Sequence, residues 1–226
     1  MAQRLFIYCE RGGDPGFWAE PLNALTNGAF VVAGIAALVM IVRQDAGRRR
    51  AVDVWLAALL CAIGVGSFLF HTLATGWAAL ADTVPIGVLM LSYLVMAERR
   101  FLGLSWWWTT LGVAAFLCAM VAVRYVPCDG GACLNGTIGY LPALVALVLV
   151  GGWLPVRRQR TGLSLLAGAA VFAVSMTFRS LDRALCDDTA VGDGMIGLHF
   201  MWHLLNAAAL FILVRAAVQW RREARN

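Results

Sequence analysis

The chain has 226 residues, of which 61% are apolar and 14% charged, and this composition excludes an ordinary soluble domain. All 18 basic residues are arginines, and with 13 acidic residues they give a net charge of +5. The arginines occur in short runs beside apolar stretches, which indicates membrane topology and contact with anionic lipid instead of nucleic-acid binding. We therefore expect an integral membrane protein with no nucleic-acid partner.

Residues 1–20 contain charges, glycine and proline but no apolar core of a signal peptide, so we expect them to remain as an outer N-terminal segment. A membrane-crossing helix needs about 20 mainly apolar residues. Because the connections leave no room for a second domain, we predict one domain over residues 1–226, an all-α bundle of seven transmembrane helices with a tail at 218–226. The predicted spans are 21–42, 52–73, 80–97, 105–126, 137–154, 162–181 and 195–217.

The arginines are concentrated on one side of the predicted bilayer. The first, third and fifth loops and the C-terminal tail together carry a net charge of +9, and the other side carries −4. Arginine-rich loops stay in the cytoplasm. We therefore predict an outside N-terminus and a cytoplasmic C-terminus, in a plasma membrane or inner membrane.

The three histidines all lie in predicted spans, where an ionisable side chain is costly and indicates function. Ser67 and His71 are four residues apart near the outer end of the second span, and His199 and His203 have the same spacing in the seventh. Each pair therefore shares a helix face. Asp82 opens the third span, so all five residues are predicted at one depth in the outer half of the bilayer.

Three imidazoles form a ligand set for zinc, and no thiolate is needed. Three protein ligands with an open position are typical of a catalytic site, where zinc makes a hydroxide nucleophile available at physiological pH. Asp82 would accept the proton of the water or orient a histidine. Ser67 would donate a hydrogen bond to an oxyanion or to the bound water.

Six motifs carry a resemblance to a known family. They are YCE (8–10), AEPLNALTN (19–27), GSFLFH (66–71), DTVP (82–85), LDRALC (181–186) and HFMWH (199–203). In this order they resemble the alkaline ceramidases, which belong with adiponectin-receptor-like proteins and GPI-lipid remodelling hydrolases to the CREST superfamily. The resemblance implies an intramembrane zinc amidase that hydrolyses ceramide to a sphingoid base and a fatty acid. It also implies zinc binding by His71, His199 and His203, with Asp82 serving the zinc water and Ser67 beside the metal.

The resemblance further implies a calcium site in the N-terminal segment, next to the zinc helices. Glu10 and Glu20 match its carboxylates, and the backbone carbonyl of Tyr8 falls at another ligand position. Ile7 and Gly12 stand where the family has Asp and Asn, and Asp14 is the candidate substitute. An oxygen-rich loop of this kind suits calcium.

Four cysteines are predicted outside the membrane, where disulfides form, and they allow three connectivities. Cys128 and Cys133 share one short loop and are candidates to pair. Cys9 and Cys186 match positions that resemble a family disulfide between the N-terminal segment and the last outer loop.

The leading hypothesis is a zinc-dependent amidase whose ceramide-like substrate enters laterally from the bilayer, without an obligate protein partner. One alternative is a related hydrolase that cleaves a phospholipid ester or another N-acyl lipid. The other is a receptor-like seven-span protein in which zinc only braces three helices.

Overall fold

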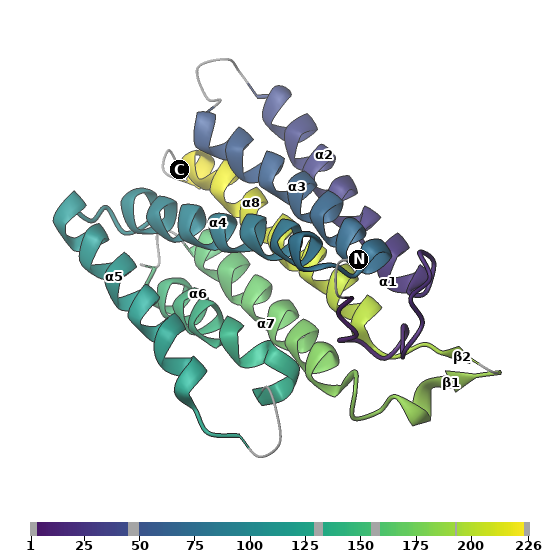
Figure 1. Ribbon diagram of the computed structural model, residues 1–226. Helices are drawn as coiled ribbons and strands as arrows, with labels where there is room; N and C mark the ends of the chain where they lie inside the picture. The colour runs from purple at the N-terminus through teal and green to yellow at the C-terminus, as the bar shows by residue number, and fades with distance from the viewer. Residues whose placement is uncertain (1–3, 45–49, 129–132, 155–158, 193, 224–226) are drawn as a thin grey trace.

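The computed structural model describes residues 4–44, 50–128, 133–154, 159–192 and 194–223. Seven described stretches are helical, long and apolar enough to cross a membrane, which confirms the predicted seven-helix fold class (Figure 1). The first of these stretches consists of two consecutive helices. The elements are α1 (Pro21–Thr26), α2 (Gly28–Val42), α3 (Ala51–Leu73), α4 (Gly76–Arg100), α5 (Trp106–Ala122), the 3-10 helices η2 (Val123–Tyr125) and η3 (Cys133–Tyr140), α6 (Leu141–Trp153), α7 (Gln159–Leu181), the 3-10 helix η5 (Asp187–Thr189), β1 (Ala190–Val191), β2 (Gly194–Met195) and α8 (His199–Glu223).

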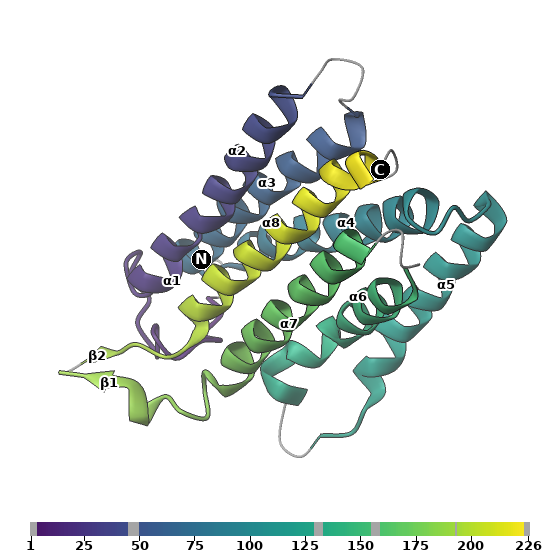
Figure 2. The ribbon, with the colours of Figure 1, turned by 180° about the vertical axis from the view of Figure 1, so that it is seen from behind.

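Helices α3 and α8 form the centre of the bundle. In the most apolar stretch of α3, 50% of the residues are buried, and in that of α8, 56% are buried. The corresponding share is 11% for the stretch that contains α5. Figures 1 and 2 show α5 and α6 together at one side of the molecule. The main hydrophobic core accordingly includes Leu56, Leu60 and Ile63 of α3 with Leu213 and Val214 of α8.

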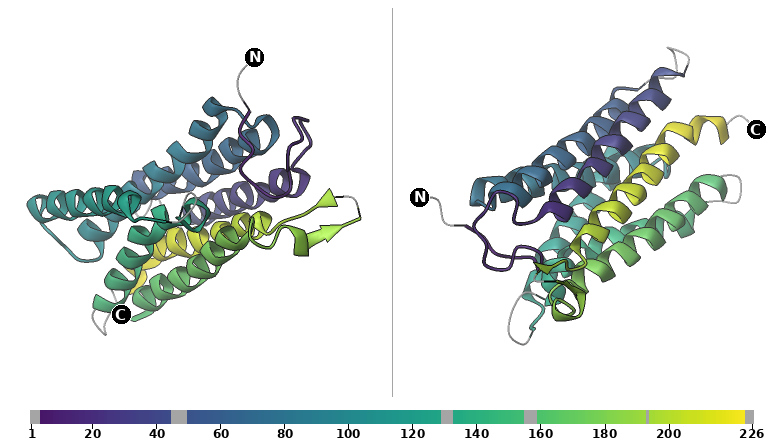
Figure 3. Two further views of the ribbon diagram at one scale, coloured as in Figure 1. Left: turned by 60° about the horizontal axis from the view of Figure 1, so that its bottom comes forward. Right: turned by 90° about the vertical axis from the view of Figure 1, so that its right-hand side faces the viewer.

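One end of the bundle is covered by loop and extended segments (Figure 3). Residues 4–20 fold over this end, and Arg4 forms an isolated β-bridge with Thr75 in the turn between α3 and α4. Strands β1 and β2 form an antiparallel hairpin there, while the last turns of α8 lie at the opposite end. We call the covered end the hairpin end.

Two disulfides lie in the loops. Cys9 is bonded to Cys186, which ties residues 4–20 to the segment between α7 and the hairpin. Cys128 is bonded to Cys133. Both pairs agree with those expected from the shared loop and from the family resemblance.

Two helices begin at other positions than hydropathy predicts. Helix α4 begins at Gly76, so Asp82 lies in its second turn and does not open it. Helix α8 begins at His199 and not near 195, because Gly194 and Met195 form β2 and Gly197 has a positive φ of 69°. Hydropathy does not register either boundary, since both depend on the turn that precedes the helix.

The orientation in the membrane remains a prediction. Several arginines on which it depends, Arg48, Arg49, Arg157, Arg158 and Arg225, lie outside the described residues. So does the end of the predicted tail, residues 224–226.

Candidate metal centre

Three histidine side chains meet inside the hairpin end of the bundle. His71 lies in the last turn of α3, and His199 and His203 lie in the first two turns of α8. All three are at most 1% exposed, and each offers a ring nitrogen within 4.8 Å of the others. In the described part of the chain, this is the one group of three or more ligand side chains found that could hold a metal ion.

Hydrogen bonds determine which ring nitrogen two of the histidines present. His71 Nδ1 lies 2.5 Å from Glu20 Oε2, and His203 Nδ1 lies 2.9 Å from Thr26 Oγ1. Thr26 donates its own proton to the carbonyl of Leu22 at 2.7 Å, so its oxygen accepts the proton of His203 Nδ1. The buried Nε2 atoms of both rings have no hydrogen-bond partner among the described residues. They therefore carry the lone pairs that a metal requires.

His199 is held through its backbone and through the face of its ring. The Asp182 carboxylate accepts the backbone N–H groups of Leu198 and His199, at 2.7 and 2.9 Å, where the start of α8 favours negative charge. Tyr8 stacks on the imidazole with ring centroids 3.6 Å apart and planes inclined by 14°. The buried Nδ1 of His199 also lacks a partner among the described residues. Since buried polar atoms normally have partners, these three histidine nitrogens fit a metal ion.

Ser67 and Asp82 meet where α3 and α4 approach closely. A side chain at Gly66 would collide with the backbone carbonyl of Ala81, so glycine permits this approach. The Ser67 hydroxyl donates a hydrogen bond to the Asp82 carboxylate, which interacts electrostatically with His71. Ser67 is buried and Asp82 is partly exposed. The structure thus brings the predicted serine and aspartate to the histidine group.

Glu20 connects His71 to the N-terminal segment. Its Oε2 accepts hydrogen bonds from His71 Nδ1 and from Asn23 Nδ2, the latter at 3.0 Å, and its Oε1 accepts one from Arg11 Nε at 2.6 Å. Burial alone would raise the pKa of Glu20, but the hydrogen bonds from His71, Arg11 and Asn23 lower it below its usual value. Glu20 is therefore an ionised acceptor that fixes the ring of His71.

Glu10 binds the first turn of α1. Its two carboxylate oxygens accept the backbone N–H groups of Leu22 and Asn23, at 2.7 and 2.8 Å. These groups lie in the first turn of α1, where backbone donors lack intrahelical partners. Burial raises the pKa of Glu10 despite these hydrogen bonds. Glu10 thus caps α1.

Among the described residues, the three carboxylates predicted for calcium, Glu10, Asp14 and Glu20, do not form a group of ligand atoms close enough to hold one ion. Asp14 Oδ1 accepts the backbone N–H of Gly16 at 2.7 Å, within its own loop. Glu20 is paired with Arg11. Calcium takes about six to eight oxygen ligands. The donor set in this arrangement does not fit calcium.

The sequence did not indicate the roles of Thr26, Asp182 and Arg11. Thr26 contacts a histidine 177 positions away in the chain, and Cys9 donates its backbone N–H to Asp182 across 173 positions. No local spacing marks such partners. The available signals were the motifs at residues 19–27 and 181–186, which contain Thr26 and Asp182.

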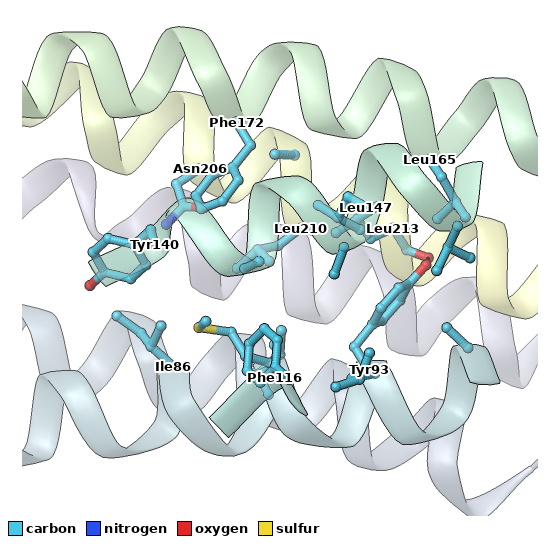
Figure 4. Close-up of a pocket in the computed structure, with 18 of the residues that line it drawn as sticks. Ile86, Tyr93, Phe116, Tyr140, Leu147, Leu165, Phe172, Asn206, Leu210 and Leu213 are labelled. Atoms are coloured by element: carbon cyan, nitrogen blue, oxygen red, sulfur yellow. Dashed lines mark hydrogen bonds between the residues drawn. The ribbon is translucent and has the colours of Figure 1, made fainter. Parts of the chain in front are cut away.

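An apolar pocket lies between α4, α6, α7 and α8. Ile63, Ile86 and Asn206 line it, and each lies one helical turn from a residue of the site, on the side away from the hairpin end. Figure 4 shows the lining residues extending along the helices from Tyr140 and Asn206 to Tyr93. Apart from the two tyrosine hydroxyls and the asparagine amide, the lining side chains are apolar.

A comparison with family models gives a match to the family described as Ceramidase, over residues 15–226. A search among curated proteins found no match. The matched range contains Ser67, Asp82 and the three histidines, and it begins after Arg11. Because the match covers almost the whole chain, this protein belongs to the ceramidase family, whose members hydrolyse the amide bond of ceramide.

Proposed function

We propose that this ceramidase is a zinc-dependent hydrolase that works within the membrane and converts ceramide-like lipids to a sphingoid base and a fatty acid. His71, His199 and His203 would hold the zinc ion. One observation carries this proposal: three buried histidines, each with a ring nitrogen that has no partner among the described residues, lie together near a carboxylate and an apolar pocket.

Zinc is the metal that suits this donor set best. Three neutral imidazole nitrogens with an open position are typical of catalytic zinc, and they offer neither the thiolates that softer metals prefer nor an all-oxygen shell. When bound, zinc would supply Lewis acidity that lowers the pKa of a water molecule and polarises the amide carbonyl. The hydrogen bonds to Glu20 and Thr26 would fix two of the ligand rings and their tautomers.

Asp82 would move the proton in the reaction. Hydrolysis forms a bond from the water oxygen to the carbonyl carbon and breaks the bond from that carbon to nitrogen. An Asp82 carboxylate oxygen would accept the proton that the water loses and return it to the leaving nitrogen. Ser67 would hold the carboxylate in position through its hydrogen bond.

The apolar pocket would receive a hydrocarbon chain of the lipid. Its almost wholly apolar lining suits a hydrocarbon chain. Because it begins one turn from the site, a chain lying in it would bring the polar amide to the histidines. An apolar substrate would enter laterally from the bilayer, on the side where α5 and α6 bury the smallest share of their residues.

We also infer the orientation from charge. The hairpin end lies on the side that carries −4, and the opposite end on the side that carries +9. The site would then lie in the outer half of a plasma or inner membrane, within one domain that comprises the whole chain.

The test is release of free fatty acid by the purified protein from a panel of ceramides, other N-acyl lipids and phospholipids, before and after metal removal. We expect the metal-loaded protein to cleave ceramides and the metal-free protein not to cleave them. Cleavage of a phospholipid ester in place of ceramide would favour a related hydrolase. A metal-loaded protein that cleaves no lipid in the panel would favour zinc as a brace between helices.

A further inference from the structure

Arg11 is a buried cation surrounded by oxygen atoms. Its side chain is 0% exposed and forms an ion pair with Glu20. A buried charge is costly unless it is paired and hydrogen-bonded. The oxygens that accept from its guanidinium are Glu20 Oε1 at 2.6 Å and the carbonyls of Asp14 at 3.2 Å, Gly16 at 2.9 Å, His71 at 2.6 Å and Thr72 at 3.4 Å. This part of the hairpin end is built around the guanidinium.

Two of these oxygens belong to the end of α3. His71 and Thr72 lie in its last turn, where carbonyl groups lack intrahelical donors and the helix dipole favours positive charge. Arginine near a helix C-terminus commonly satisfies such carbonyls. Arg11 therefore fixes the backbone of His71.

The ring of His71 is fixed by the same arginine through Glu20. Arg11 Nε binds one oxygen of this carboxylate, and the other oxygen lies 2.5 Å from His71 Nδ1. Arg11, Glu20 and His71 thus form a closed triangle of contacts. A change at Arg11 would release both the backbone and the ring of His71.

We propose that Arg11 is the resident cation of the hairpin end, a positioning residue that aligns His71 for metal binding and makes a calcium ion unnecessary. The proposal rests on the proposed function only in assigning a metal to His71. The family resemblance implies a calcium ion beside these helices. In this protein the guanidinium of Arg11 supplies the positive charge that pairs with the buried carboxylate of Glu20.

The surroundings of Arg11 leave no suitable ligand set for an additional dication. Glu10 uses both carboxylate oxygens to cap α1, and Glu20 already binds the guanidinium. Ile7 and Gly12 offer no side-chain oxygen where the family has Asp and Asn. A calcium ion close to Glu20 would also be repelled by the charge of Arg11.

The first experiment uses the full-length, zinc-loaded protein in calcium-free buffer. Calcium is titrated by calorimetry, and fatty-acid release from ceramide is measured before and after calcium is added. We expect no saturable calcium binding and the same rate in both conditions. Saturable binding of calcium, or a rate that requires it, would overturn the proposal.

The second experiment measures metal affinity with cobalt(II), whose visible absorption reports binding to the histidine group. We expect Arg11→Gln to bind cobalt about 10–100-fold more weakly than the wild type, as is typical when a partner of a metal ligand is lost. Arg11→Lys, which keeps the charge, should recover part of this affinity. The matched control is Arg4→Gln, because Arg4 is exposed and donates to the α3 carbonyl of Leu73 at 3.4 Å without an ion pair to Glu20.

Equal cobalt affinity in the wild type and Arg11→Gln would contradict the positioning role. If Arg11→Gln does not fold, the calcium titration of the wild type still decides, because saturable calcium binding would contradict the proposal. A wild-type protein that binds cobalt but cleaves no ceramide would refute the proposed function and leave the comparison of affinities valid.

Discussion

The hairpin end and the apolar pocket differ in the interactions that determine their structure. At the hairpin end, several buried polar side chains are hydrogen-bonded to one another, as in the pairs Glu20 with His71 and Thr26 with His203. In the pocket one turn away, nearly all lining side chains are apolar, and the Tyr93 hydroxyl donates to the carbonyl of Leu213 at 2.9 Å. The first region depends on individual hydrogen bonds, and the second depends on shape.

This difference predicts two kinds of response to substitution. Loss of one partner in a buried polar network leaves the other unsatisfied and disturbs the geometry of the site. A change of size in an apolar pocket alters discrimination between substrates by a more modest factor. The predictions below test this contrast, in order of decreasing expected effect.

The largest effect is expected at a metal ligand. His203→Ala removes one of three imidazoles, so we predict loss of both bound zinc and hydrolysis. Metal analysis of the purified protein and fatty-acid release from ceramide measure the two quantities. Hydrolysis at the wild-type rate by a zinc-free His203→Ala protein would refute the assignment.

Asp82→Asn should separate chemistry from metal binding. The amide keeps the size of the side chain but cannot accept the proton, so the rate should fall by about 10²–10⁴ while zinc content is unchanged. Thr83→Ala is a suitable control, because Thr83 is the exposed neighbour of Asp82 and donates only to the carbonyl of Ala79. Equal rates in Asp82→Asn and the control would remove Asp82 from the reaction.

Thr26→Val tests a partner that the sequence did not reveal. Loss of the hydroxyl leaves His203 Nδ1 without its acceptor, so we expect metal affinity to fall by about 10–100-fold. Thr110→Val is the matched control, since Thr110 makes the same bond to a carbonyl one turn back, on α5. Cobalt titration of both variants measures the difference, and equal affinities would show that Thr26 has no role in metal binding.

The smallest effect is expected in the pocket. Ala146→Phe shortens the space for a hydrocarbon chain, so hydrolysis of long-chain ceramides should fall relative to short-chain ones by about tenfold. Val145→Phe on the same helix is the control, because Val145 is 46% exposed and does not line the pocket. Competition between the two ceramides gives the ratio. An unchanged ratio in Ala146→Phe would place the acyl chain elsewhere.

The sequence predicted the parts that depend on composition and on local spacing. Mean hydropathy indicated seven spans, and the four-residue spacings placed Ser67 with His71 and His199 with His203. The length of the apolar stretches is sufficient for the first inference, and helical periodicity is sufficient for the second. The family resemblance then indicated the enzyme class.

Contacts between distant segments could not be predicted in this way. Asp182 lies in the motif at residues 181–186, which assigns it no role, yet it binds the first turn of α8 because Gly197 has a positive φ and no side chain in its place. Glu20 contacts His71, 51 positions away in the chain, as well as Arg11. Such roles depend on how residues 4–20 fold over the helices.

The most direct test of the account is a zinc titration of the metal-free wild-type protein, followed by release of fatty acid from ceramide. The account predicts that hydrolysis rises in proportion to bound zinc and saturates at one ion per chain. Full hydrolysis by the metal-free protein, or none when one zinc is bound, would contradict it.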